Sequence, residues 1–145
     1  MTELNLFFNK ITKVPETIGK LINLTKLNLV SNQIEEMPKA MVNLKNLIEL
    51  NLSYNDISEI PLEIYNLTNL EILKLDNNGI RKISESIRKL INLKYLYLDY
   101  NDIKQIPKSI VNLKHLEDLH LNNNPLNGGE IDELKLLLPN TDIQY

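Results

Sequence analysis

The chain has 145 residues, a net charge of −3 and no cysteine or tryptophan. This length fits one domain, since single domains commonly hold roughly 100–200 residues. The lack of cysteine excludes a disulfide framework, a thiolate metal site and a cysteine nucleophile. The slightly acidic balance disfavours nucleic acid as a partner, because surfaces that bind nucleic acid are normally basic.

The first residues carry no signal for export or membrane insertion. Residues 1–6 lack both the basic region and the apolar stretch of roughly 7–15 residues that a signal peptide needs. No apolar run in the chain approaches the roughly 20 residues of a membrane-spanning helix. For the chain as given, we expect a soluble cytoplasmic protein that does not bind membranes.

An internal repeat dominates the sequence. Leucine, asparagine and isoleucine occur 28, 21 and 18 times. One series of asparagines recurs at a constant interval of 23 residues: Asn9, Asn32, Asn55, Asn78, Asn101 and Asn124. Two series of leucines keep the same interval, which defines six repeats that begin at residues 1, 24, 47, 70, 93 and 116. We number the positions of each repeat from 1 to 23.

The third repeat shows the full pattern, LxxLxLxxNxIxxIPxxIxxL, between Leu47 and Leu67. Its LxL pair has the period of a strand, with one buried face and one solvated face. Pro61 and the helical spacing from Ile64 to Leu67 predict a short helical or 3₁₀ return limb. One such unit cannot bury its apolar side, but six stacked units share a continuous core under a parallel sheet with ~4.8 Å between strands.

The asparagines at position 9 are predicted to be structural. A short amide side chain can pair backbone groups that a tight bend leaves unpaired, and losing such pairing costs about 1–3 kcal/mol per group. The alternative, a row of asparagines that faces a ligand, is disfavoured because these residues follow the phase of the buried leucines.

The repeat pattern over residues 1–113, with a variant sixth repeat, resembles the leucine-rich repeat family in its 23-residue form. The resemblance implies an α/β fold: a right-handed solenoid of six repeats with a parallel sheet on its concave face, which binds another protein and has no enzymatic activity. We treat residues 1–145 as a single domain of this kind. The fourth repeat departs from the pattern with Ser84 in place of proline and Gly79 after its asparagine, so we expect a looser turn or return limb there.

The last repeat breaks the pattern after Asn124. Ile131, Leu134 and Leu138 form one apolar stripe, which predicts a capping helix over residues 130–138 inside a C-terminal cap of about residues 127–145. Residues 142–145 could add one more short strand beyond this helix.

No comparable cap precedes the first repeat. The strand around residues 4–6 is therefore expected to expose an unpaired edge, and Phe7 and Phe8 are expected to shield its side. Two alternatives follow: the chain associates with itself through this edge, or a longer chain continues on its N-terminal side.

The side chains that flank the strand leucines are the variable ones, and tyrosines concentrate among them in the fifth repeat. Tyrosine and exposed aliphatic side chains are typical of interaction hot spots. The alternative is that the tyrosines only pack on one another across the sheet. The predicted partner-binding residues are Tyr95, Tyr97, Tyr100, Ile72, Lys74, His120 and Tyr54.

Catalytic and metal sites are weakly indicated. His115 and His120 are predicted on opposite sides, so they cannot share a metal or a triad. Asp76, Asp99 and Asp118 could hold a divalent cation or act as paired carboxylates, but we interpret them as a solvated acidic rim. No glycine-rich phosphate loop is present. We predict no catalytic residues, no metal and no cofactor.

The first hypothesis is therefore a non-catalytic module that binds an unidentified folded protein or extended peptide on its concave sheet. The second is a structural or regulatory repeat fragment of a larger protein that positions a neighbouring domain. An ion-dependent binder or enzyme that uses the three aspartates is a distant third.

Overall fold

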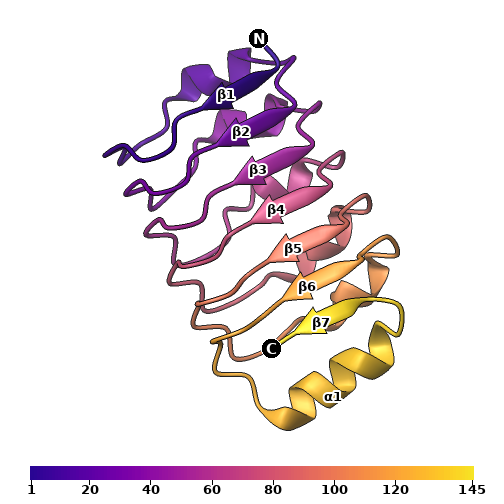
Figure 1. Ribbon diagram of the computed structural model, residues 1–145. Helices are drawn as coiled ribbons and strands as arrows, with labels where there is room; N and C mark the ends of the chain where they lie inside the picture. Colours follow the sequence, from indigo (N-terminus) through magenta and orange to yellow (C-terminus); the bar gives the residue numbers. More distant parts are fainter.

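Every repeat contributes one three-residue strand to a single sheet in the computed structural model, which describes residues 1–145. The strands are β1 (Glu3–Asn5), β2 (Lys26–Asn28), β3 (Glu49–Asn51), β4 (Ile72–Lys74), β5 (Tyr95–Tyr97), β6 (Asp118–His120) and β7 (Asp142–Gln144). They are parallel and lie in chain order along one side of the molecule (Figure 1). Equivalent positions pair, as Leu50 does with Leu73, so the interval of 23 residues becomes the register of the sheet.

The return limbs are 3₁₀ helices that lie behind the sheet (Figure 1). They are η1 (Glu16–Lys20), η2 (Lys39–Asn43), η3 (Ile64–Asn66), η4 (Glu85–Lys89) and η5 (Lys108–Asn112). Proline directly precedes η1, η2 and η5, where its fixed φ suits the first turn and its missing N–H breaks no helical bond. This confirms the predicted short helical or 3₁₀ limb.

One continuous core of 37 buried apolar residues runs between the sheet and the return limbs. The strand leucines at its centre, such as Leu73 and Leu96, are fully buried. At the N-terminal end, Leu4 and Leu6 are only half-buried, because one side of β1 faces solvent. Stacking therefore buries what a single repeat exposes, as the sequence predicted.

The asparagines at position 9 tie consecutive repeats together. In the third repeat, the Nδ2 of Asn55 donates to the carbonyl oxygens of Leu52 and Ser53. The same Nδ2 donates to the carbonyl of Leu29 in the preceding repeat, and Oδ1 accepts from the N–H of Ile34. The same pattern recurs at Asn32, Asn78, Asn101 and Asn124. Their predicted structural role is confirmed.

The fourth repeat is not looser than the others, so that expectation was wrong. Its limb η4 has five residues, whereas η3, which follows a proline-containing turn, has three. The Ser84 hydroxyl accepts from the N–H of Ser86 and caps the limb. The N–H of Ser84 donates to the hydroxyl of the buried Tyr65 at 3.2 Å, a bond that proline cannot make. In the turn, the N–H of Gly79 donates to the carbonyl of Ile57.

Tyr65 therefore compensates for the missing proline. Its side chain is fully buried. Its hydroxyl accepts from the N–H of Ser84, a donor that the prolines at this position in the neighbouring repeats lack. Burial raises the pKa of Tyr65 to about 12, so the hydroxyl stays protonated.

The C-terminal cap has the predicted helix, but it begins earlier than expected. Helix α1 spans Gly128–Leu137 and covers the end of the stack (Figure 1). It starts two residues before the predicted residue 130, because the Asn127 side chain accepts from the N–H of Glu130 and fixes the first turn. The apolar stripe predicted on this helix is buried, and β7 adds the expected last strand beside β6.

At the opposite end, the outer edge of β1 has no partner strand. Phe7 and Phe8 do not shield it, since 57% and 80% of their surfaces are exposed. That expectation was wrong because positions 7 and 8 of the repeat lie on the solvent side of the sheet and not over the open end of the core. None of the helices is long and apolar enough to cross a bilayer.

Candidate protein-binding surface

Three neighbouring strands carry most of the side chains predicted to bind a partner. On β4, β5 and β6 the central leucine is buried, and the residues on both sides of it are partly exposed. The register places Lys74 beside Tyr97, and Tyr97 beside His120. We call five of these side chains the central patch: Ile72, Lys74, Tyr95, Tyr97 and His120.

Position 5 of these strands forms a row of contacting side chains. The rings of Tyr97 and His120 lie 4.6 Å apart, tilted by 48°. The ammonium of Lys74 lies 5.5 Å from the centre of the Tyr97 ring and 3.7 Å from a carboxylate oxygen of Glu49. Desolvation in this row raises the pKa of Tyr97, which keeps its hydroxyl neutral. The tyrosines thus do pack across the sheet, and they still leave part of their surface open.

Position 3 of β5 is held in a different way. The hydroxyl of Tyr95 donates to a carboxylate oxygen of Glu117 at 2.8 Å. This hydrogen bond raises the pKa of Tyr95. No signal in the sequence had indicated Glu117, because its position in the repeat lies just before the strand. The bond fixes the direction of the Tyr95 ring on the open face.

Tyr54 and Tyr100 stand apart from the central patch. Both follow a strand at position 8, and both are 56% exposed. Their backbones have φ of 58° and 56°, in the left-handed region. Neither hydroxyl makes a hydrogen bond within the chain, and neither ring pairs with another aromatic ring. The structure therefore brings five of the seven predicted residues together and leaves these two as separate exposed rings.

The backbone explains why position 5 differs along the sheet. In the first three repeats, position 5 is asparagine, and its side-chain oxygen accepts from the N–H at position 7 of the same repeat. In the third repeat, for example, Asn51 accepts from the N–H of Ser53 at 3.1 Å. Each of these asparagines accepts a backbone N–H, so another residue type at position 5 would leave that N–H without its acceptor.

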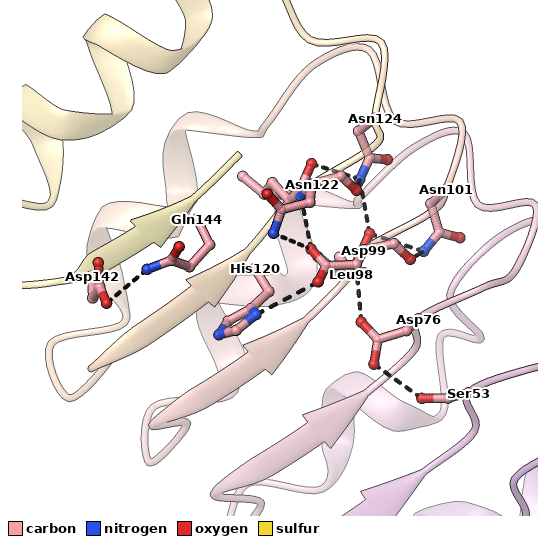
Figure 2. A network of polar contacts seen from close by, with 11 residues as sticks. Ser53, Asp76, Leu98, Asp99, Asn101, His120, Asn122, Asn124, Asp142 and Gln144 are labelled. Atoms are coloured by element: carbon pink, nitrogen blue, oxygen red, sulfur yellow. Dashed lines mark hydrogen bonds and ion pairs between the residues drawn. The ribbon is translucent and has the colours of Figure 1, made fainter.

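In the later repeats an aspartate at position 7 takes over this task. Asp76 accepts from the N–H of Asp99 at 2.9 Å, and Asp99 accepts from the N–H of Asn122 at 2.7 Å. Figure 2 shows this chain of contacts running from one repeat to the next. Because these aspartates already accept the N–H at position 7, Tyr97 and His120 at position 5 do not have to accept it.

Asp76 and Asp99 are not a solvated acidic rim, so that interpretation was wrong. Both oxygens of Asp76 accept hydrogen bonds, from the hydroxyl of Ser53 and from the N–H of Asp99. Burial raises the pKa of Asp76 above its ordinary value. The second oxygen of Asp99 lies 3.6 Å from Nδ1 of His120. The signal was present in the sequence, since in the fourth and fifth repeats aspartate appears at position 7 and asparagine is absent from position 5.

The other acidic and histidine side chains stay apart. Asp118 lies at position 3 of β6, beside Tyr95 of β5 in the register. His115 is exposed in the turn before β6. No group of three or more acidic or histidine side chains lies close enough to hold a metal ion.

Comparison with known families agrees with this architecture. A family model for a leucine-rich repeat region matches residues 49–137, and a second, for the leucine rich repeat, matches residues 1–57. The chain belongs to the leucine-rich repeat family. Domains of this family generally bind other proteins and are typically not enzymes. A search of curated proteins found no significant match.

Solved structures share the leucine-rich repeat solenoid. A leucine-rich repeat protein of Leptospira interrogans aligns over 100% of this chain with 38% identity and a TM-score of 0.96. An internalin, InlF, of Listeria monocytogenes aligns over 99% of it with 27% identity and a TM-score of 0.86. The chain spans 37% and 41% of the length of these two proteins. The predicted family and solenoid fold are confirmed.

Proposed function

We propose that this leucine-rich repeat domain is a non-catalytic module that binds a protein partner on its concave sheet face. The contacts are centred on the central patch, with Tyr54 and Tyr100 at its margin. The supporting feature is the change at position 5, where asparagines that serve the backbone give way to Lys74, Tyr97 and His120. The first three repeats form the same strand with asparagine at this position.

The central patch has the properties of an interaction hot spot. Tyrosines bury a large area at small entropic cost and offer a hydroxyl at the margin of the contact. Here the ring of Tyr97 is already held by His120 and Lys74, and the ring of Tyr95 is held by Glu117. A surface that is ordered before binding loses less entropy on association.

A double substitution tests this proposal. Replacing Tyr95 and Tyr97 by alanine removes both rings but leaves the leucine core intact. We expect the proteins captured by the wild-type domain to be lost, or their dissociation constants to rise about tenfold or more. Ile91→Ala is the matched control, because Ile91 is exposed outside the sheet. Unchanged capture by the double variant, with an unchanged circular-dichroism spectrum, would remove this surface as the binding site.

A second candidate function is favoured by the N-terminal end. The outer edge of β1 is unpaired, and Leu4 and Leu6 beneath it are only half-buried. Such an edge suits pairing with a second copy or docking against a neighbouring domain. In that case the domain acts as a spacer or regulatory element. Light scattering at high concentration tests pairing with a second copy, since a strict monomer contradicts self-association.

A further inference from the structure

Position 8 carries an aromatic ring in every second repeat. Phe8, Tyr54 and Tyr100 occupy it in the first, third and fifth repeats, with 80%, 56% and 56% of their surfaces exposed. The intervening repeats carry small polar residues: Ser31, Asn77 and Asn123. We call the three exposed rings the aromatic row.

The aromatic row is costly for the fold. All six residues at position 8 have φ between 52° and 58°, in the left-handed region. Asparagine tolerates this region, whereas a bulky aromatic residue there is a genuine outlier. The Tyr54 and Tyr100 hydroxyls make no hydrogen bond, and the row forms no aromatic pair. Packing within the chain therefore does not account for these rings.

The spacing along the aromatic row follows from backbone pairing. The N–H groups of Phe8, Tyr54 and Tyr100 each donate at 2.8 Å to a carbonyl of the next repeat. Position 8 thus keeps the spacing of the sheet, ~4.8 Å per repeat, so that neighbouring members of the row lie ~9.6 Å apart at the backbone.

This period discriminates among partner conformations. Three residues of a polyproline II helix advance by ~9.3 Å. Two residues of an extended strand advance by ~6.6 Å, and seven residues of an α-helix by ~10.5 Å. Because the N–H groups of the row are already paired, the face offers no backbone donors for strand addition. Of these three conformations, the polyproline II helix comes nearest to the period of the row, and its three residues per turn bring the same face to each successive ring.

Charge defines the partner further. Asp56 and Asp102 follow Tyr54 and Tyr100 by two residues, and both are exposed with no ion-pair partner. The corresponding position after Phe8 holds Lys10, so these two carboxylates accompany Tyr54 and Tyr100 only. Uncompensated carboxylates beside exposed rings favour a cationic occupant.

We propose that the aromatic row binds a proline-rich segment in the polyproline II conformation, with proline on each ring and arginine or lysine toward the aspartates. This inference rests on the proposed function and names the class of its partner. Proline stacks on the rings through side-chain contact alone and brings no unpaired N–H to the interface.

Synthetic peptides test the inference. The probe is a fluorescent peptide of four Pro-Arg-Pro units, measured by polarisation against the whole domain. The same peptide with alanine for proline keeps the charge but loses the conformation, and the same peptide with glutamate for arginine keeps the conformation but reverses the charge. We expect binding of the first peptide and a loss of about tenfold or more for each of the other two.

Variants then locate the site. Tyr54→Asn combined with Tyr100→Asn installs the residue that position 8 already carries in two repeats, so the fold is retained. We expect this variant to lose the Pro-Arg-Pro peptide by about tenfold or more. Tyr145→Asn is the control, because Tyr145 is equally exposed but lies outside the row.

Three results would overturn the inference: no binding at millimolar peptide, equal binding of the alanine peptide, or equal binding by the Tyr54/Tyr100 variant. The proposed function can survive any of them. If captured proteins still depend on Tyr95 and Tyr97 while the proline peptide fails, the module stands and only its partner class is wrong.

Discussion

The first three and the last three repeats build the same backbone with different side chains. In the first half, asparagine at position 5 accepts the N–H at position 7 of its own repeat, as Asn51 does for Ser53. In the fourth and fifth repeats, aspartate at position 7 accepts the N–H at position 7 of the following repeat, as Asp76 does for Asp99. A required hydrogen bond can thus be moved to another position, and the position that it leaves becomes open to other side chains.

The two arrangements differ in their electrostatic cost. The asparagine amide is neutral, whereas Asp76 is a half-buried carboxylate whose pKa is raised mainly by desolvation. A carboxyl group whose folded pKa lies above its unfolded value contributes stability at low pH that is lost as the pH rises through the folded value. At neutral pH the second half therefore carries a half-buried charged group that the first half does not have. In return, position 5 of the second half is open to Lys74, Tyr97 and His120.

The largest contrast is expected in the core. Leu73→Ala should lower the free energy of unfolding by about 2–5 kcal/mol, because the side chain is fully buried and the neighbouring repeats cannot fill the cavity. Leu4→Ala at the same position of the first repeat should cost clearly less, because Leu4 is only half-buried. Urea denaturation followed by circular dichroism measures both. Equal losses would show that burial is uniform along the stack.

The junction between the halves should respond to alkaline pH. Tyr65 has a pKa of about 12 in the folded protein and an ordinary value of 10.0. Its stabilising contribution is therefore fully present below pH 10.0 and is lost as the pH rises through about 12, a change of about 2–3 kcal/mol.

Tyr65→Phe supplies the control for this titration. The variant lacks that part of the pH dependence, and it loses about 1–3 kcal/mol at pH 9 because the N–H of Ser84 has no acceptor. Urea denaturation at pH 9 and pH 12 compares the two proteins. An identical pH dependence of unfolding in both would contradict the role assigned to this hydroxyl.

A smaller effect tests whether the two acceptors of the position 7 N–H, asparagine at position 5 and aspartate at position 7, can replace each other. Asp99→Ala removes the acceptor of the Asn122 N–H, which should cost about 1–3 kcal/mol. His120→Asn in the same chain recreates the arrangement of the first half, in which the position 5 amide accepts from position 7. We expect the double variant to regain part of the lost stability. A double variant whose loss equals the sum of the single losses would show that the two arrangements are not equivalent.

Much of the fold could be predicted from the sequence because its interactions repeat with a fixed interval. The register of the strands, the buried leucines and the asparagines at position 9 all follow from it. The start of helix α1 did not follow from the interval, because it is fixed by the Asn127 cap, which the apolar stripe does not indicate. The positions of the seven predicted binding residues on the solvent side also followed from the period, while their division into a contacting patch and two separate rings did not.

The interval of 23 residues by itself determined that this chain stacks into a solenoid, which residues enter the core and which face stays open. The tertiary structure alone decided how the individual side chains are used. Tyr65 and Ser84, or Asp76 and Asp99, lie about one repeat apart in the chain and meet only in the stack. A periodic pattern specifies which positions become neighbours, but the partner of each polar group depends on the side chains that happen to meet there.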